Sequence, residues 1–253
     1  MENSKKIFIS IFILLPLISI SCNFQNIKDN NKVNINKEME QTKKETHNVF
    51  KDYQPARQLN INKFNANSEK NHYHFIDDNG MEVHQFADAE FPSGKINKYW
   101  EKRKYPNSAY EFYSEYDAKG LLMKTLTSFY TAEIGVMCFY DVSGNITQKE
   151  NLDAPYKFSL DDLIDKMKDE YEIDILTPNL IWDVNRYVVD KENMPFYEVK
   201  VRDLVRIGII HVYFIDGNTG ETLLITTRET EWSGQPSERV LDEYIRKKAN
   251  GEL

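Results

Sequence analysis

Turn signals divide the middle of the chain into short runs of strand length, and this feature constrains the fold most. The stretches YDAKGLLMK from Tyr116 and YDVSGNITQK from Tyr140 both read Tyr-Asp-x-x-Gly. In each, an aromatic residue closes a strand, aspartate caps the turn, and glycine supplies the positive φ before a new strand begins. Asp117 and Asp141 lie 24 residues apart, about one hairpin of chain. The pattern predicts an antiparallel meander.

Another hairpin is expected where the folded part begins, near His72. The stretch HYHFIDDNGMEVHQF has apolar or aromatic runs on both sides of the turn residues 77–80, in which Asn-Gly accepts positive φ. A loop of two or four residues would pair even positions with odd ones, so that His72 and His74 share one face of the sheet and His84 lies on the other. We therefore expect no three-histidine metal site here unless the loop is odd.

The character of the sequence changes at Pro155. Ser159 and Asp162 form an N-terminal cap for a helix with one apolar stripe, formed by Leu160, Leu163, Ile164, Met167 and Tyr171. Three β-type runs and a turn at DGNTGETL follow, and a last helix is expected after Pro236, with Asn250-Gly251 as its C-terminal cap. The sequence thus predicts a β-dominated α+β fold: an antiparallel β-meander at 72–155, then a helix-plus-antiparallel-sheet module with a C-terminal helix at 156–253.

Two resemblances accompany this architecture. Over residues 91–150 the Tyr-Asp-x-x-Gly stretches resemble the YD repeats of Rhs-type proteins and the MORN-variant repeats of bacterial envelope and immunity proteins, although ordinary hairpins explain them equally well. Residues 158–228 resemble the PepSY domain, a small helix-and-sheet module of secreted and envelope proteins. The matching residues are Tyr213, Asp216, Thr219, Gly220 and Glu221. This chain departs from the usual pattern by an extra residue at Gly217-Asn218.

The N-terminus carries export information. Lys5 and Lys6 precede an apolar run, Ile7–Ile20, of about 14 residues, whereas a helix needs about 20 to cross the hydrocarbon core. A secretory signal fits this pattern, and an uncleaved signal anchor is the alternative. The residues ISISC, ending at Cys22, resemble the lipobox of bacterial lipoproteins. That resemblance implies cleavage before Cys22, a diacylglyceryl thioether on its sulfur, and, since Asn23 follows, an outer-membrane location facing the periplasm or the exterior.

Residues 1–21 are therefore expected to be a signal peptide, and residues 22–71 a lipid-anchored flexible tether, because Asn, Lys, Gln and Glu dominate them. The formal net charge of -8 argues against nucleic-acid binding, which needs clustered basic residues. With Cys22 lipidated, Cys138 has no partner for a disulfide, and it is interpreted as a small buried residue.

The sequence lacks the catalytic motifs H-E-x-x-H, G-x-S-x-G, Walker A and G-x-G-x-x-G. The acidic residues between Asp161 and Glu170 are interpreted as the polar side of the helix, and His211 as a partly buried histidine with a satisfied partner. We therefore predict no enzymatic activity, no catalytic residues, no cofactor and no metal.

Aromatic residues crowd the span from 99 to 116, and strand alternation cannot place all of them in a core. Half of them on an outer face would form a surface for protein or glycan recognition, whereas burial beneath the C-terminal module is the alternative. The candidate contact residues are Tyr99, Trp100, Tyr110, Phe112 and Tyr113. The expected function is non-enzymatic binding of an envelope or extracellular protein, for instance as an inhibitor or immunity protein. An accessory structural lipoprotein of an outer-membrane complex is the alternative, and a secreted hydrolase is disfavoured.

Overall fold

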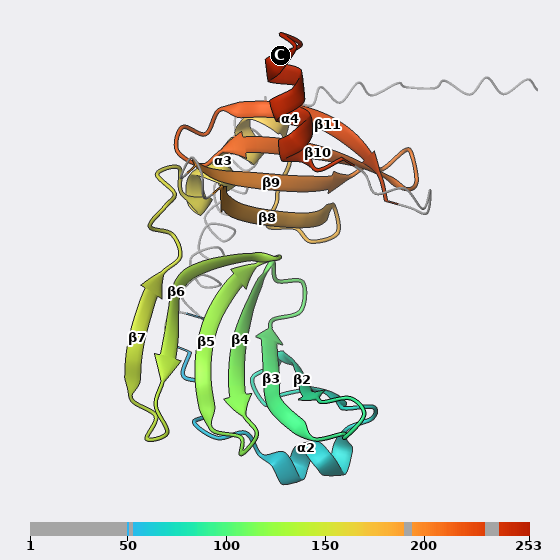
Figure 1. The fold of residues 1–253 in the computed structure, drawn as a ribbon. Coiled ribbons are helices and arrows are strands. Elements are labelled where there is room, and N and C mark those ends of the chain that lie inside the picture. The colour runs from blue at the N-terminus through green and yellow to red at the C-terminus, as the bar shows by residue number, and fades with distance from the viewer. Residues whose placement is uncertain (1–49, 51–52, 190–193, 231–237) are drawn as a thin grey trace, which may run out of the picture. The chain divides into compact units, whose positions relative to one another are not determined.

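The computed structural model describes residues 50, 53–189, 194–230 and 238–253 (Figure 1). The chain divides into a unit at Met1–Lys51 and a compact unit at Asp52–Leu253. The fold described below is that of the second unit. The expected signal peptide, the lipidation of Cys22 and most of the predicted tether lie outside the described residues.

The first part of this unit is a seven-stranded antiparallel sheet in which every strand pairs with the next one along the chain (Figure 1). This order confirms the predicted meander. The strands are β1 (His72–Ile76), β2 (Glu82–Ala89), β3 (Ile96–Lys104), β4 (Tyr110–Asp117), β5 (Leu122–Phe129), β6 (Ala132–Tyr140) and β7 (Ile146–Asn151).

One turn structure recurs in this sheet. At Asp117 and Asp141 the carboxylate Oδ1 accepts hydrogen bonds of 2.8 to 2.9 Å from the backbone N–H groups two and four residues later. Asp77 makes the same two bonds, both of 2.9 Å. The glycine three residues after each aspartate has a φ of 78 to 80°. The Asp-x-x-Gly spacing therefore builds three hairpins of the meander in the same way.

The folded part begins earlier than the sequence indicates. Helix α2 (Ile61–Asn67) lies within the predicted tether, and its Phe64 is buried together with Leu59 against Tyr99 and Tyr116 of the sheet. The prediction of a flexible tether is therefore wrong for residues 53–71. Two isolated apolar residues without helical periodicity gave no sign that they fill the inner face of the meander.

A second, separate sheet of four antiparallel strands, in the order β11-β10-β9-β8, forms the C-terminal part. It follows α3 (Leu160–Tyr171) and precedes α4 (Val240–Ala249), as predicted. The Ser159–Asp162 capping box is present at the start of α3. The strands are β8 (Ile181–Val189), β9 (Met194–Arg202), β10 (Ile209–Asp216) and β11 (Thr222–Glu229).

Both faces of the second sheet are covered. Val240 and Leu241 of α4 pack on the face that carries Val212 and Phe214. The opposite face carries Tyr213, whose ring lies 4.7 Å from that of Tyr171 in α3. Because side chains alternate along a strand, the two helices lie on opposite sides of the sheet. Of the helices that the structure describes, none is long and apolar enough to cross a membrane.

Candidate metal centre

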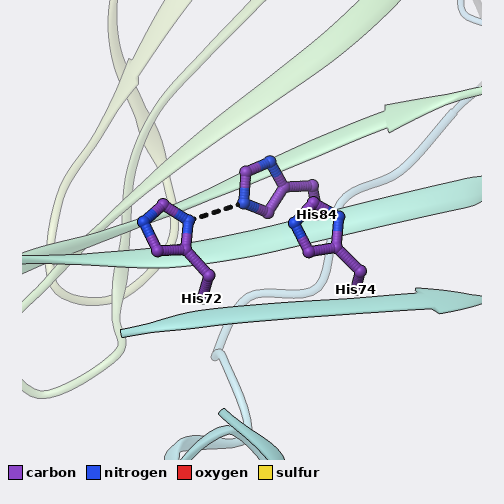
Figure 2. A group of neighbouring side chains, drawn as sticks. All are labelled: His72, His74 and His84. Atoms are coloured by element: carbon purple, nitrogen blue, oxygen red, sulfur yellow. Dashed lines mark hydrogen bonds between the residues drawn. The ribbon is translucent and has the colours of Figure 1, made fainter. Parts of the chain in front are cut away.

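The first hairpin of the meander brings three histidines together on one face. His74 of β1 lies directly opposite His84 of β2 in the strand register, with ring centroids 3.7 Å apart. His72 precedes His74 by two residues and so points to the same side, with its ring centroid 5.2 Å from that of His84. Figure 2 shows the three imidazoles gathered over the two strands. The prediction that His84 lies on the opposite face is wrong.

The turn explains this difference. The Asp77 N–H donates to the Met81 carbonyl and the Gly80 N–H donates to the Asp77 carbonyl, both at 3.0 Å, so three residues link the two strands. A three-residue loop of this kind ends in a residue with positive φ, here Gly80 at 78°. With an odd loop and no bulge between β1 and β2, even positions pair with even ones, and all three histidines share a face.

The imidazole nitrogens are close enough to share one ion. One ligand nitrogen from each histidine lies within 4.8 Å of the other two. His72 Nδ1 and His84 Nε2 are 2.9 Å apart, which makes them a hydrogen-bonded pair (Figure 2). Tetrahedral zinc with Zn–N bonds of about 2.0–2.1 Å holds its ligand nitrogens about 3.4 Å apart. Nitrogens within 4.8 Å of one another can reach such spacings when the imidazole rings rotate.

The electrostatics favour the metal-binding form of His84. Burial, together with the charges of His74, His72 and Lys102, lowers the pKa of His84 to about 4. Its imidazole is therefore neutral at physiological pH, which is the form that binds a metal. Metal binding therefore requires no loss of an imidazolium proton from His84.

Aromatic and basic residues of β2 to β4 surround the histidines on the same face. Phe86 stacks between His72 and Trp100, with centroid distances of 6.0 and 6.1 Å. Lys102 lies opposite both His84 and Tyr113 in the strand register, and its Nζ is 4.7 Å from the centre of the Tyr113 ring. The cluster therefore sits in a half-exposed surface of rings and charges.

Three imidazole ligands leave one position of a tetrahedral ion open. Imidazole suits Zn²⁺, Cu²⁺ and Ni²⁺. His72 and His74 are exposed and His84 is half-buried, so an ion bound here is in contact with solvent. This arrangement can bind a divalent transition metal and exchange the fourth ligand.

The structure divides the predicted aromatic contact residues between two faces. Tyr99, Tyr110 and Phe112 are buried, each less than 8% exposed. They face the inner side of the meander, so they are unavailable for the predicted contact surface. Trp100 and Tyr113 lie on the histidine face and are half-buried. Alternation along β3 and β4 separates neighbouring aromatics in this way.

The remaining candidates lie elsewhere. His211 Nε2 is 3.1 Å from the Asp203 carboxylate, which confirms the prediction of a satisfied histidine. The Cys138 thiol is free and partly buried rather than fully buried. Comparisons with known protein families, with curated proteins and with solved structures find no match for this chain.

Proposed function

We propose that this chain is a non-enzymatic binding protein of the cell envelope that holds a divalent transition-metal ion, with Zn²⁺ as the reference ion, on His72, His74 and His84. The observation that carries the proposal is the strand register, which sets His74 opposite His84 and His72 on the same face. Two rigid strands position all three ligands, so little order has to be created when the ion binds.

Binding is favoured over metal-dependent catalysis because the centre is open. His72 and His74 are exposed on the first strand of the sheet. Metal-assisted reactions gain from sites that exclude water and strengthen the field at the reacting atoms. An exposed centre instead suits capture and release of an ion.

The location in the envelope is proposed from the N-terminal sequence. The lipobox-like residues before Cys22 support a lipid anchor in the outer membrane. Replacing Cys22 with Ala is expected to abolish incorporation of labelled fatty acid into the chain. Persistent labelling of that variant would contradict the anchor while leaving the metal site untouched.

The metal site is tested by calorimetric titration of Zn²⁺ into the metal-free chain. We expect His72→Ala, His74→Ala and His84→Ala each to weaken binding at least about 10- to 100-fold, since even the outer-shell partners of metal sites are worth that much. His211→Ala is the matched control, because His211 pairs with Asp203 on the other sheet. Binding of one equivalent of Zn²⁺ that survives all three substitutions would overturn the proposal.

Protein recognition is the second candidate function, and the observation that favours it is the half-buried Trp100 on the outer face of the meander. Lys98 and Lys124 lie over its ring, with Nζ 4.8 and 5.6 Å from the centroid. A half-buried tryptophan with cations on its face resembles the centre of many protein interfaces. Co-purification from detergent-solubilised envelope is expected to recover a stoichiometric partner that Trp100→Ala releases. An inhibitor or immunity role further predicts that deletion sensitises cells to neighbouring competitors.

A further inference from the structure

The histidine cluster opens onto a hollow on the same face of the meander. The hollow has a volume of about 460 Å³, and its wall includes His74 and His84. Volumes of about 300–1,000 Å³ are typical of sites for small molecules. Besides Phe75 and Val83, the wall is completed by five residues of the outer face, namely Ile76, Glu82, Lys102, Lys104 and Glu111. A molecule seated there can therefore touch an ion held by the histidines.

We propose that the metal-loaded centre binds a small organic carboxylate in this hollow, with one carboxylate oxygen as the fourth metal ligand. This inference rests on the proposed function. It assigns Lys102, in the row of His74 and His84, to the carboxylate and Ile76, two residues further along β1, to the apolar end of the molecule.

The position of Lys102 supports this assignment. Lys102 lies directly across from His84 in the pairing of β2 with β3. Directly opposed residues have Cβ atoms about 4.5–5.5 Å apart, so a long lysine side chain reaches a ligand bound beside the imidazole. Lys104, two residues further along β3, faces the same side and lies opposite Glu82.

The ion pairs of both lysines are long. Lys102 Nζ is 3.7 Å from a Glu111 carboxylate oxygen, and Lys104 Nζ is 3.7 Å from Glu82. Ion pairs of this length at a solvent-exposed surface contribute little, so each ammonium can turn toward a new anion at small cost.

Charge balance calls for an anion at the fourth position. The two lysines and two glutamates of the hollow cancel, and three neutral imidazoles add nothing to the charge of the ion. A divalent cation therefore leaves a net charge of about +2 in the hollow as long as the fourth ligand is a neutral water and not hydroxide. A carboxylate halves it.

The exposed side chain of Ile76 in the wall of the hollow indicates that the ligand also has an apolar part. Ile76 is 62% exposed although it lies in a strand next to the histidines. A short alkyl chain that extends from the carboxylate along β1 would cover this side chain. The hollow should consequently prefer butanoate to acetate.

The test uses the full chain in mild detergent, loaded with Co²⁺, whose visible bands report on coordination. Acetate and butanoate are titrated separately at constant ionic strength. We expect a saturable change in the bands with both anions and tighter binding of butanoate. Lys102→Gln should weaken both anions about fivefold, the upper end for a surface ion pair, without weakening Co²⁺ itself. Lys119→Gln, in the exposed turn after β4, is the control and should change neither. Ile76→Ser should remove the preference for butanoate.

The outcomes separate the two proposals. Failure to bind Co²⁺ would contradict the proposed function and, with it, this inference. Bound Co²⁺ whose bands respond to neither anion would overturn the carboxylate site alone. An equal loss of affinity in Lys102→Gln and Lys119→Gln would show that only the general surface potential attracts anions, and would also overturn it.

Discussion

The two sheets differ in what covers them. In the second sheet α3 and α4 cover opposite faces, so that Val212 and Tyr213, neighbours in β10, both contact a helix. In β2 to β4 of the meander, one face is buried and the other is half-exposed, as the alternating burial of these strands shows. The second sheet uses both faces for its core, whereas the meander keeps a face on which a site can be displayed.

No described helix packs on the exposed face of the meander, so the hairpin that carries the histidines must be stabilised by other contacts. Asp77 supplies it from the turn, since one carboxylate oxygen caps the turn and the other accepts a 2.7 Å hydrogen bond from Arg103. Arg103 also donates to Glu101 at 2.7 Å, and Glu101 is almost fully buried beside Gln85. This network on the buried side holds the turn whose geometry sets the register of the exposed side.

The largest expected effect comes from breaking this network. Arg103→Met should lower the free energy of unfolding by about 3 kcal/mol, because it leaves the Glu101 carboxylate buried with Gln85 as its one hydrogen-bond donor among the described residues. It should also weaken Zn²⁺ binding, although Arg103 does not touch the histidine face. Urea denaturation and calorimetry measure the two effects.

Arg206→Met is the control for that prediction. Arg206 pairs with Asp203 at 2.7 Å but is 59% exposed, so its loss should cost less than about 1 kcal/mol. Equal destabilisation by the two substitutions would contradict a special role for the buried network.

Turn glycines of the two sheets differ in how closely they are packed. Gly80 and Gly220 both have positive φ, 78 and 74°. A Cβ at Gly80 would meet nothing within 4 Å, whereas one at Gly220 would overlap the ring of Phe158. Gly80→Ala should therefore cost about 1–2 kcal/mol from backbone strain alone. Gly220→Ala should cost about 1 kcal/mol more, because the helix-side packing of the second sheet must also shift.

Thermal or urea denaturation of the two glycine variants checks this order. A Gly80→Ala variant that is as unstable as Gly220→Ala would mean that the exposed hairpin is packed as tightly as the covered sheet. The contrast between the sheets would then not hold.

Local patterns predicted most of the fold, because they are set by nearby residues. The apolar stripe and the cap at Ser159 define α3, and Asp-x-x-Gly defines the hairpins at Asp117 and Asp141. The burial of Phe64 depends on Tyr99 and Tyr116, which are distant in the sequence, and the Asn60 cap by itself does not distinguish a helix of seven residues from a loop. The packing of Phe64 on Tyr99 and Tyr116 also decides which face of β3 and β4 is buried. Tyr99 is therefore buried, whereas its neighbour Trp100 is half-buried on the other face.

The histidine site was missed for a reason that the sequence itself contains. The dipeptide Asn79-Gly80 is typical of a hairpin loop with an even number of residues. However, Asp77 and Gly80 have the same Asp-x-x-Gly spacing as the turns at Asp117 and Asp141. Treating all three turns alike gives a three-residue loop, and with it the pairing of His74 with His84. The sequence does not predict that the pairing of β1 with β2 has no bulge. The similar turn between β4 and β5 is accompanied by a register shift, and such a shift in the first hairpin would move His84 to the other face.

The smallest expected effect comes from a carboxylate of a helix that covers the second sheet. Burial opposes ionisation of Glu243 in α4, but hydrogen bonds from Lys247 and Arg228 outweigh it and lower the pKa to about 2, from an ordinary value of 4.5. Because the folded-state pKa is depressed, this carboxylate contributes stability above pH 4.5, and the contribution is lost as pH falls toward 2. Lys247 is 28% exposed, so screening limits the contribution to about 1 kcal/mol.

Urea denaturation at pH 7 and at pH 3 of the native chain and of Glu243→Gln measures this contribution. We expect the variant to be less stable at pH 7 and the difference to shrink at pH 3, because at pH 3 Glu243 binds a proton in the unfolded chain but stays mostly ionised in the folded one. A difference that stays constant with pH would assign the role of Glu243 to packing instead of charge. In that case α4 would cover its sheet by apolar contacts alone, through residues such as Val240 and Leu241.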